Sequence, residues 1–234
     1  MALRFIVISL TIGIVLFTHL PAYTQARISI GLMYNVFNLK SLKNGQSAII
    51  KELPFDAKVV ENFPGYLGYK LTSHIPINNH LSLGAIAMFT STGGRISYAD
   101  YSGNYQLDQS LYFGSFGPSL EGYAANGKNN ETLEFHYGVN VTIDIVNYKF
   151  YSLLNLPPDI SESSSANLTS VGMSVWPFMG PIFPITKVLL ININAGYQLN
   201  VIRGKMKYFG SVVGAGPNWS GFRLEVSIVY NFEK

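Results

Sequence analysis

The most regular feature of the chain is a strict alternation of apolar and polar residues close to its C-terminus. Every second residue of this segment is apolar: Phe222, Leu224, Val226, Ile228, Tyr230 and Phe232. Arg223 and Glu225 lie between them. An alternation with a period of two predicts a β-strand with one apolar and one polar face. The segment is longer than the ~5–6 residues common in soluble sheets and matches the roughly 9–11 residues of a tilted membrane-spanning strand.

The same alternation recurs along the chain and predicts further strands, to a total of eight. Two segments show it as clearly, at residues 133–145 and 188–201. Five weaker strands are expected near residues 28–37, 64–76, 81–98, 107–124 and 168–184. The phase shifts near Gly93, where a β-bulge is expected, and again near Ser115. Pro177 and Pro181 predict irregular pairing in the 168–184 strand, because proline cannot donate to a ladder.

Short and long connections alternate between these strands. The short ones are residues 77–80, 125–130 and 184–187; the long ones are 38–63, 99–106, 151–167 and 204–218. Outer-membrane barrels have short periplasmic turns and longer outside loops. We therefore expect both termini on the periplasmic side and four long loops outside. The serine-rich part of the 151–167 loop is expected to be mobile.

The N-terminal segment predicts export. Arg4 precedes an apolar run over residues 5–17, and Thr24, Gln25 and Ala26 form a small-residue cleavage site. This pattern predicts a secretory signal peptide at residues 1–26, cleaved after Ala26, with the mature domain at 27–234. An uncleaved anchor is the alternative, although the run falls short of the ~20 apolar residues of a membrane helix. The chain has no Cys, which excludes a lipoprotein anchor and a thiolate metal site.

Composition separates a membrane barrel from a soluble one. Charged residues make up 12% of the chain, against about 25% in average soluble domains. A lipocalin-like barrel would place the apolar faces inward, leaving an outer surface of glycines and small polar residues with few charges. The opposite arrangement, an all-β, eight-stranded antiparallel up-and-down transmembrane β-barrel, encloses these residues in a polar lumen. Only helices and closed barrels can cross lipid. No basic run indicates nucleic-acid binding.

Aromatic residues near the strand ends predict two interfacial girdles. The periplasmic girdle is expected to contain Tyr123, Phe135, Tyr137, Phe183, Tyr230 and Phe232. The outer girdle is expected to contain Tyr34, Phe63, Tyr148, Phe150, Trp219 and Phe222.

The eight strands, the alternating loop lengths and the last strand ending Val229-Tyr230-Asn231-Phe232 resemble the small outer-membrane barrels. These include OmpA/OmpX-like barrels and the PorT-like barrels of Bacteroidota. The resemblance covers the mature chain and implies insertion by the barrel-assembly machinery. It departs from the usual terminal signal because Glu233 and Lys234 follow the last aromatic residue. A PorT-like barrel would be an accessory of a secretion system.

The polar face carries the ionisable residues that are candidates for function. They are Lys70, His74, Glu121, Glu134, His136, Asp144, Arg223 and Glu225. Buried charges are costly unless they pair, and an eight-stranded barrel is just wide enough for side chains to fill. We expect Arg223 and Glu225 to point inward and to pair with Lys70, Glu121 or Glu134. Such pairs would plug the lumen; a narrow or gated conduit is the alternative.

Enzyme chemistry has little support in the sequence. His136 and Asp144 lie eight residues apart on one face, which is roughly 26 Å along a strand. No Ser has a nucleophile elbow, no ligand spacing indicates a metal, and no cofactor is expected. We predict a non-enzymatic surface, structural or interaction protein that meets an envelope or extracellular protein through its outer loops. Its surroundings would be outer-membrane lipid and lipopolysaccharide. The alternatives are a narrow channel for small or apolar solutes and a secretion accessory.

Overall fold

A computed structural model describes residues 26–124, 134–157 and 160–232. The predicted signal peptide lies outside these residues apart from Ala26. Eight strands form a ring: β1 (Arg27–Phe37), β3 (Tyr66–Asn78), β4 (Leu81–Asp100), β5 (Gly103–Ala124), β6 (Glu134–Leu156), β7 (Ile160–Pro184), β8 (Leu189–Ile202) and β11 (Gly221–Asn231). Each strand pairs antiparallel with the next, and β11 pairs with β1 to close the ring. The predicted eight-stranded up-and-down barrel is confirmed.

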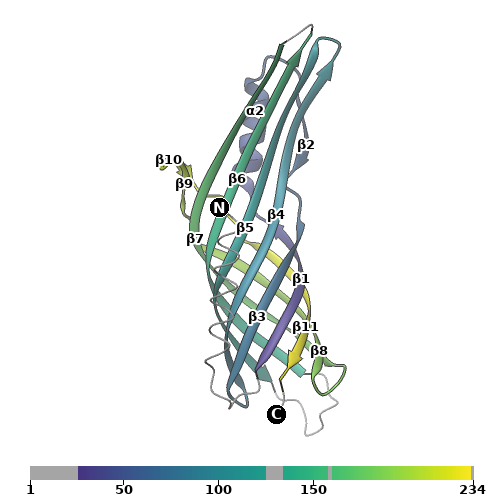
Figure 1. The fold of residues 1–234 in the computed structure, drawn as a ribbon, viewed down its shortest axis with the longest axis vertical. Helices are drawn as coiled ribbons and strands as arrows, with labels where there is room; N and C mark the ends of the chain where they lie inside the picture. Colours follow the sequence, from purple (N-terminus) through teal and green to yellow (C-terminus); the bar gives the residue numbers. More distant parts are fainter. Residues whose placement is uncertain (1–25, 125–133, 158–159, 233–234) are drawn as a thin grey trace.

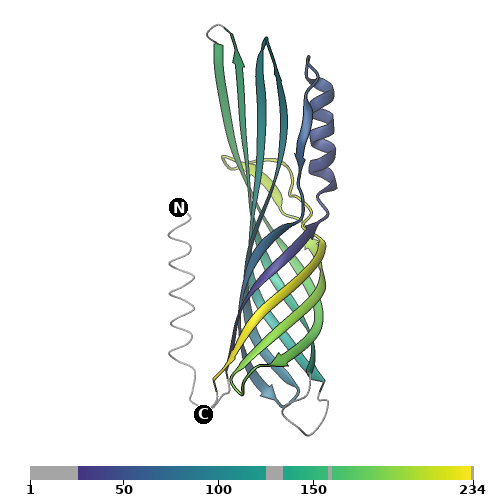
Figure 2. The same cartoon turned by 90° about the vertical axis from the view of Figure 1, so that its right-hand side faces the viewer.

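The ring is continued at one end by two long hairpins, β4–β5 and β6–β7 (Figures 1 and 2). We call this the hairpin end, and the opposite end, where β1 begins and β11 stops, the terminus end. Residues 99–106 and 151–167 are therefore not the long loops that the sequence predicted. β4 ends at Asp100 and β5 begins at Gly103, and Ser161 to Ser165 pair with β6. In β7, Ser161 to Ser165 are polar on both faces of the strand, so the alternation that marks a strand is lost there.

The other two predicted long loops also contain regular structure. Residues 38–63 hold α2 (Lys40–Glu52) and β2 (Lys58–Asn62), which pairs with β4. Residues 204–218 hold the short hairpin of β9 (Lys205–Tyr208) and β10 (Ser211–Ala215). Helix α2 lies alongside the projecting hairpins (Figure 2). Its Ile49 and Ile50 pack against Ile96 of β4 and Leu107 of β5, which gives the projecting part an apolar core of its own.

The two phase shifts in the sequence are not bulges. The pairing of β4 with β5 runs without a break from Leu81 to Asp100, past Gly93 and Ser115. The apolar residues change face instead: Phe89 points outward from the barrel, whereas Ile96 points inward toward the core under α2. The expected bulge at Gly93 is therefore wrong, and a change of surroundings along one continuous strand explains the pattern.

The two prolines of β7 disturb its pairing, as predicted. β7 pairs continuously with β6. Its ladder with β8 skips Trp176 and Pro177, and again Gly180 and Pro181, and its register shifts after Met173. The missing N–H groups of the prolines explain why the interruption falls on one side of the strand.

An apolar band surrounds the barrel on its outer side. Every strand of the ring exposes large apolar side chains there, among them Leu32, Leu71, Phe89, Phe116, Ile143, Met179, Leu199 and Leu224. Arg223 and Glu225 point inward and are 1% and 0% exposed, whereas Leu224 and Val226 are 42% and 50% exposed. The predicted orientation of the last strand is confirmed, and a soluble barrel with an apolar interior is excluded.

Candidate functional site

The centre of the barrel holds a buried ion pair. The Lys70 ammonium of β3 lies 2.7 Å from a carboxylate oxygen of Glu225 on β11, and both side chains are almost completely buried. Asn194 donates to the same oxygen at 3.3 Å, and its own side-chain oxygen lies 2.5 Å from Nε2 of His136. Lys70 also lies 5.2 Å from the ring centre of Trp176. The cation thus has a counter-ion and an aromatic face, which together offset its desolvation.

A second polar group closes the terminus end. Nε2 of His74 lies 2.8 Å from the Ser119 hydroxyl and 3.4 Å from Glu121. Tyr123 donates to Glu121 at 2.7 Å, and the Arg27 guanidinium lies 4.6 Å from the Tyr123 ring centre. The cavity among these side chains has a volume of about 20 Å³, which is room for about one water molecule.

Arg223 and Asp144 lie between the central pair and the hairpin end. Arg223 donates to the side-chain oxygen of Asn35 and lies 5.5 Å from the ring centre of Phe113. Asp144 accepts hydrogen bonds from Thr142 at 3.0 Å and from Ser174. Among the described residues, no carboxylate lies within 4.0 Å of Arg223. The expected ion pairing therefore holds for Glu225 with Lys70 but not for Arg223, which is held by an amide and aromatic rings.

Glu134 lies apart from the other seven sequence-predicted lumen residues. It is the first residue of β6 and its side chain is exposed at the terminus end. Glu134 lies on the same face of β6 as the inward-pointing His136. The barrel ends at this level, however, so the Glu134 side chain is open to solvent. The predicted partnership of Glu134 with Arg223 or Glu225 is wrong.

An apolar layer fills the barrel at the hairpin end. Its buried members are Phe37, Leu39, Phe63, Leu111, Phe113, Val146, Tyr148, Met206 and Trp219. The Trp219 ring packs edge-on against Phe37, with 4.8 Å between ring centres, and lies tilted against Phe113 at 4.6 Å. Phe63, Tyr148 and Trp219 are therefore inside the barrel and do not belong to an outer girdle, contrary to the prediction. The lumen therefore contains an apolar layer at the hairpin end and the polar groups between it and the terminus end.

The remaining aromatic residues lie largely as predicted. Phe135, Tyr137, Phe183, Tyr230 and Phe232 are exposed at the terminus end, and Tyr34 and Phe222 are exposed near the hairpin end. Phe150 was predicted for the outer girdle, but it is half-buried and packs against the apolar layer and the core under α2. Tyr123 points into the lumen, where it binds Glu121. The terminus-end girdle is thus present without Tyr123, and the girdle at the hairpin end is sparse.

Several residues that complete the lumen were not singled out in the sequence. Asn35, Ser174 and Asn194 are fully buried and hydrogen-bond to the charged groups. Their inward phase could have identified them, because each alternates with apolar outward residues. Trp176 and Phe178 also face the lumen, but the sequence did not identify them. Pro177 and Pro181 interrupt the run of apolar residues on the outward face of β7, so the alternation there was unclear.

No protein-family model matches the chain, and no curated protein matches it either. The solved structures that are similar to it at low identity include three outer-membrane or surface proteins. One is the outer membrane protein OprG from Pseudomonas aeruginosa, at 12% identity and a TM-score of 0.47 over 90% of this chain and 97% of that one. Neisserial surface protein A matches at 11% and 0.38 over 88% and 97%. The attachment invasion locus protein Ail of Yersinia pestis matches at 15% and 0.35 over 89% and 99%. The fold itself rests on the closed ring of strand pairs.

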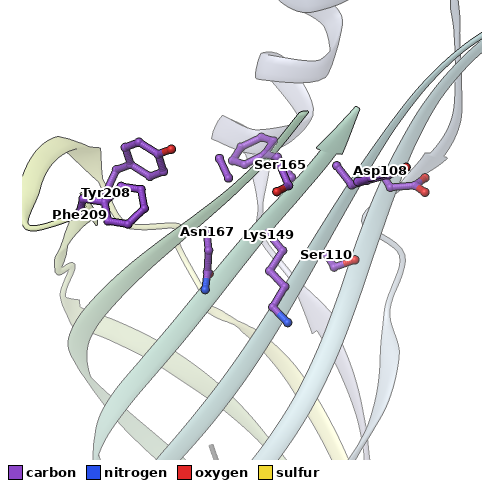
Figure 3. Close-up of a pocket in the computed structure, with 10 residues that line it drawn as sticks. Asp108, Ser110, Lys149, Ser165, Asn167, Tyr208 and Phe209 are labelled. Atoms are coloured by element: carbon purple, nitrogen blue, oxygen red, sulfur yellow. The ribbon is translucent and has the colours of Figure 1, made fainter. Parts of the chain in front are cut away.

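A second cavity, larger than the one at the terminus end, lies outside the barrel, beside the bases of the projecting hairpins. It has a volume of about 670 Å³. Its lining comes from β5, β6, β7 and the β9–β10 turn: Asp108, Ser110, Lys149, Phe150, Tyr151, Ser165, Ala166, Asn167, Tyr208 and Phe209 (Figure 3).

No group of three or more metal-ligating side chains occurs within residues 26–124, 134–157 and 160–232. The one helix of the described chain, α2, is too short and polar to cross a membrane.

Charged groups on the hairpins are held by local hydrogen bonds. Arg95 of β4 donates to Asp108 of β5 at 2.6 Å, and this bond raises the pKa of the guanidinium. At the β4–β5 turn, Asp100 accepts from the Ser102 hydroxyl at 2.6 Å and from Tyr98 at 2.5 Å. These bonds lower the pKa of Asp100, with that from Ser102 having the larger effect. The turn is therefore tied to an ionised carboxylate.

Proposed function

We propose that the protein is a non-enzymatic outer-membrane barrel that presents a rigid external structure for contact with another protein or surface. This structure, which we call the platform, consists of α2, β2 and the projecting parts of the β4–β5 and β6–β7 hairpins. The apolar band on all eight strands supports insertion in lipid, because each outward position meets hydrocarbon there. The side chains that fill the lumen support an anchor and not a pore. The barrel-assembly machinery and outer-leaflet lipid would be its partners during insertion and afterwards.

The distribution of connections supports the orientation that we propose. At the terminus end, the described turns are short: Asn78 and Leu81 bracket one, and Pro184 and Leu189 the other. Helix α2, β2, the long hairpins and the β9–β10 hairpin all lie toward the other end (Figures 1 and 2). Because short turns face the periplasm in such barrels, the hairpins would be outside and both termini inside.

The observation that carries this proposal is the apolar core under α2. Ala57, Ile96 and Leu107 are buried there, well beyond the barrel. Mobile loops would not need such a core, whereas a platform that holds a fixed shape does. The tips of the platform expose apolar residues, including Tyr101 at 98% and Ile160 at 53% exposed. Exposed apolar groups on an ordered support are typical of interaction surfaces.

Conductance distinguishes the anchor from the narrow channel. The purified, refolded protein is inserted in planar lipid bilayers and compared with the double variant Phe113→Ala/Trp219→Ala, which thins the apolar layer. We expect no single-channel steps from the wild type and intermittent steps from the variant. Stable steps from the wild type would contradict the anchor and support the channel. Lost secretion on deletion of the gene would support the accessory role that the PorT-like resemblance implies.

A further inference from the structure

The 670 Å³ cavity lies at the level where the apolar band ends. On the outward face, Ile145 of β6 is level with Val171 of β7, and both are exposed aliphatic residues. Two residues farther along β6, Asn147 is level with Thr169, and two residues beyond that, Lys149 is level with Asn167. The surface thus changes from aliphatic to polar over about 10 Å of height, given ~3.4 Å per residue and a tilt near 40°. The head-group layer of one leaflet is roughly 5–8 Å thick, so this change spans the edge of the hydrocarbon and the head groups above it.

The position of Lys149 agrees with this level. Its ammonium lies 5.2 Å from the ring centre of Tyr112, which faces outward on β5 at 38% exposed. Tyrosine and lysine both favour the membrane–water interface, where one end of the side chain is apolar and the other is wet. In Figure 3 the ammonium turns away from the hairpin tips and toward the barrel.

The charge of the cavity is positive. Asp108 is paired with Arg95, so its charge is compensated within the protein. Lys149 has no carboxylate within 4.0 Å among the residues that the structure places. Lys207 of β9 stands next to Thr169 at the margin of the cavity. Two strand spacings and two residues separate Lys207 from Lys149, which places their Cα atoms about 12 Å apart.

The rest of the lining fits a sugar. Tyr208 and Phe209 project from the β9–β10 turn, with 4.7 Å between their ring centres. Apart from its contact with Tyr208, Phe209 is open to solvent, with 93% of its surface exposed. Aromatic rings supply flat apolar faces, and Ser110, Ser165 and Asn167 supply hydroxyl and amide groups around them. The volume falls within the roughly 300–1,000 Å³ of sites for small molecules of several rings.

We propose that this cavity binds the phosphorylated saccharide head group of a glycolipid in the adjoining membrane leaflet. Lys149 and Lys207 bind phosphate groups at the two ends of the saccharide, and Phe209 with Tyr208 covers a sugar face. The head group of phosphatidylglycerol has one phosphate and no ring, so it offers nothing to the aromatic pair and reaches only one of the two lysines. The inference rests on the proposed membrane location, which sets the level of the cavity.

Lipid binding to the purified full-length mature protein in detergent tests the site. Native mass spectrometry measures binding of bisphosphorylated lipid A, monophosphorylated lipid A and phosphatidylglycerol, and of water-soluble glucose 1-phosphate. We expect bisphosphorylated lipid A to bind at least tenfold more tightly than the other three. Lys149→Gln and Lys207→Gln should each weaken it about tenfold, since each loses a charge-assisted contact. Phe209→Ala should weaken both forms of lipid A and leave phosphatidylglycerol unchanged.

Lys187→Gln is the matched control, because Lys187 is also exposed but lies in the turn at the terminus end. Equal lipid A binding by Lys149→Gln and Lys187→Gln would overturn the proposal. If phosphatidylglycerol binds as tightly as bisphosphorylated lipid A, the site does not recognise a saccharide. If glucose 1-phosphate binds as tightly, the ligand need not come from the membrane. Flotation of the same samples with lipid vesicles separates the two proposals. A protein that floats but ignores lipid A defeats only this site, whereas a protein that fails to float defeats the membrane location as well.

Discussion

The buried pair of Lys70 and Glu225 gives the sharpest test of the packed lumen. The two side chains are 2% and 0% exposed, so solvent does not screen their interaction. Removal of one partner of such a pair typically costs about 3–5 kcal/mol, because the other charge stays buried without its counter-ion. Glu225→Gln retains an acceptor for Asn194 and leaves Lys70 near Trp176. We therefore expect it to destabilise the barrel by about 3 kcal/mol, and Lys70→Met by about 3–5 kcal/mol.

The double variant Lys70→Met/Glu225→Gln buries no net charge, and we expect its stability to lie within about 1–2 kcal/mol of the wild type. The coupling energy of the cycle, which is the sum of the two single effects minus the effect of the double variant, is then about 4–8 kcal/mol. Urea titrations in lipid vesicles, followed by tryptophan fluorescence, measure each stability. Trp176 and Trp219 are both buried in the barrel and report its opening. Lys187→Met is the control and should change the free energy of unfolding by less than about 0.5 kcal/mol.

A result in which both single variants stay within about 1 kcal/mol of the wild type would refute the reasoning. Additive effects would refute it as well, since they would mean that the two charges do not interact. Either outcome would place water around the pair and would favour the conduit over the plugged barrel.

Three further predictions concern the platform and the barrel wall. Ile96→Ala should lower the local stability of the core under α2 by about 2–4 kcal/mol, because it leaves a cavity there. Amide hydrogen exchange should become faster in α2 and stay the same in the barrel. Exchange in α2 equal to that of the wild type would mean that other contacts hold the helix. The β4–β5 turn should be fully ordered above the ordinary Asp pKa of about 3.9 and should loosen as the pH falls through the lower folded value of Asp100. The amide signal of Ser102 reports this, and an unchanged signal at pH 2 would contradict it. Gly180→Ala should cost roughly 1–3 kcal/mol, because its Cβ would collide with the Ile193 carbonyl; a urea midpoint equal to that of Gly214→Ala, where a Cβ meets open space, would exclude the clash.

The barrel could be predicted from the sequence because lipid and lumen make opposite demands on alternate residues. Leu224 and Val226 against Arg223 and Glu225 show this most clearly, and the structure keeps that orientation. The prolines of β7 likewise predicted where pairing fails. Beyond the barrel the rule changes, since the outer side meets water and the inner side meets α2. Residues 151–167, which end β6 and begin β7, were therefore predicted as a loop, and helix α2 within residues 38–63 was not predicted.

The sequence predicted which charged residues face the lumen, but it did not predict most of the contacts between them. Alternation indicated which charged residues face inward, and Lys70 with Glu225 lie together as expected. Which carboxylate meets which cation depends on the stagger of strands far apart in the chain, and alternation does not contain that information. Arg223 illustrates the limit, because its partners are Asn35 and aromatic rings. Trp219 and Phe63 belong to residues between the strands, so no periodicity placed them inside the barrel.

Cysteine labelling in intact cells tests the central claim, a membrane barrel with its hairpins outside, most directly. The chain has no native Cys, so each introduced thiol reports one position. Tyr101→Cys lies at the β4–β5 turn, 98% exposed, and Thr186→Cys lies at the exposed turn between β7 and β8. A membrane-impermeant maleimide should label position 101 in intact cells and position 186 only after the outer membrane is opened. Labelling of position 186 alone, or recovery of both variants as soluble periplasmic protein, would contradict the account.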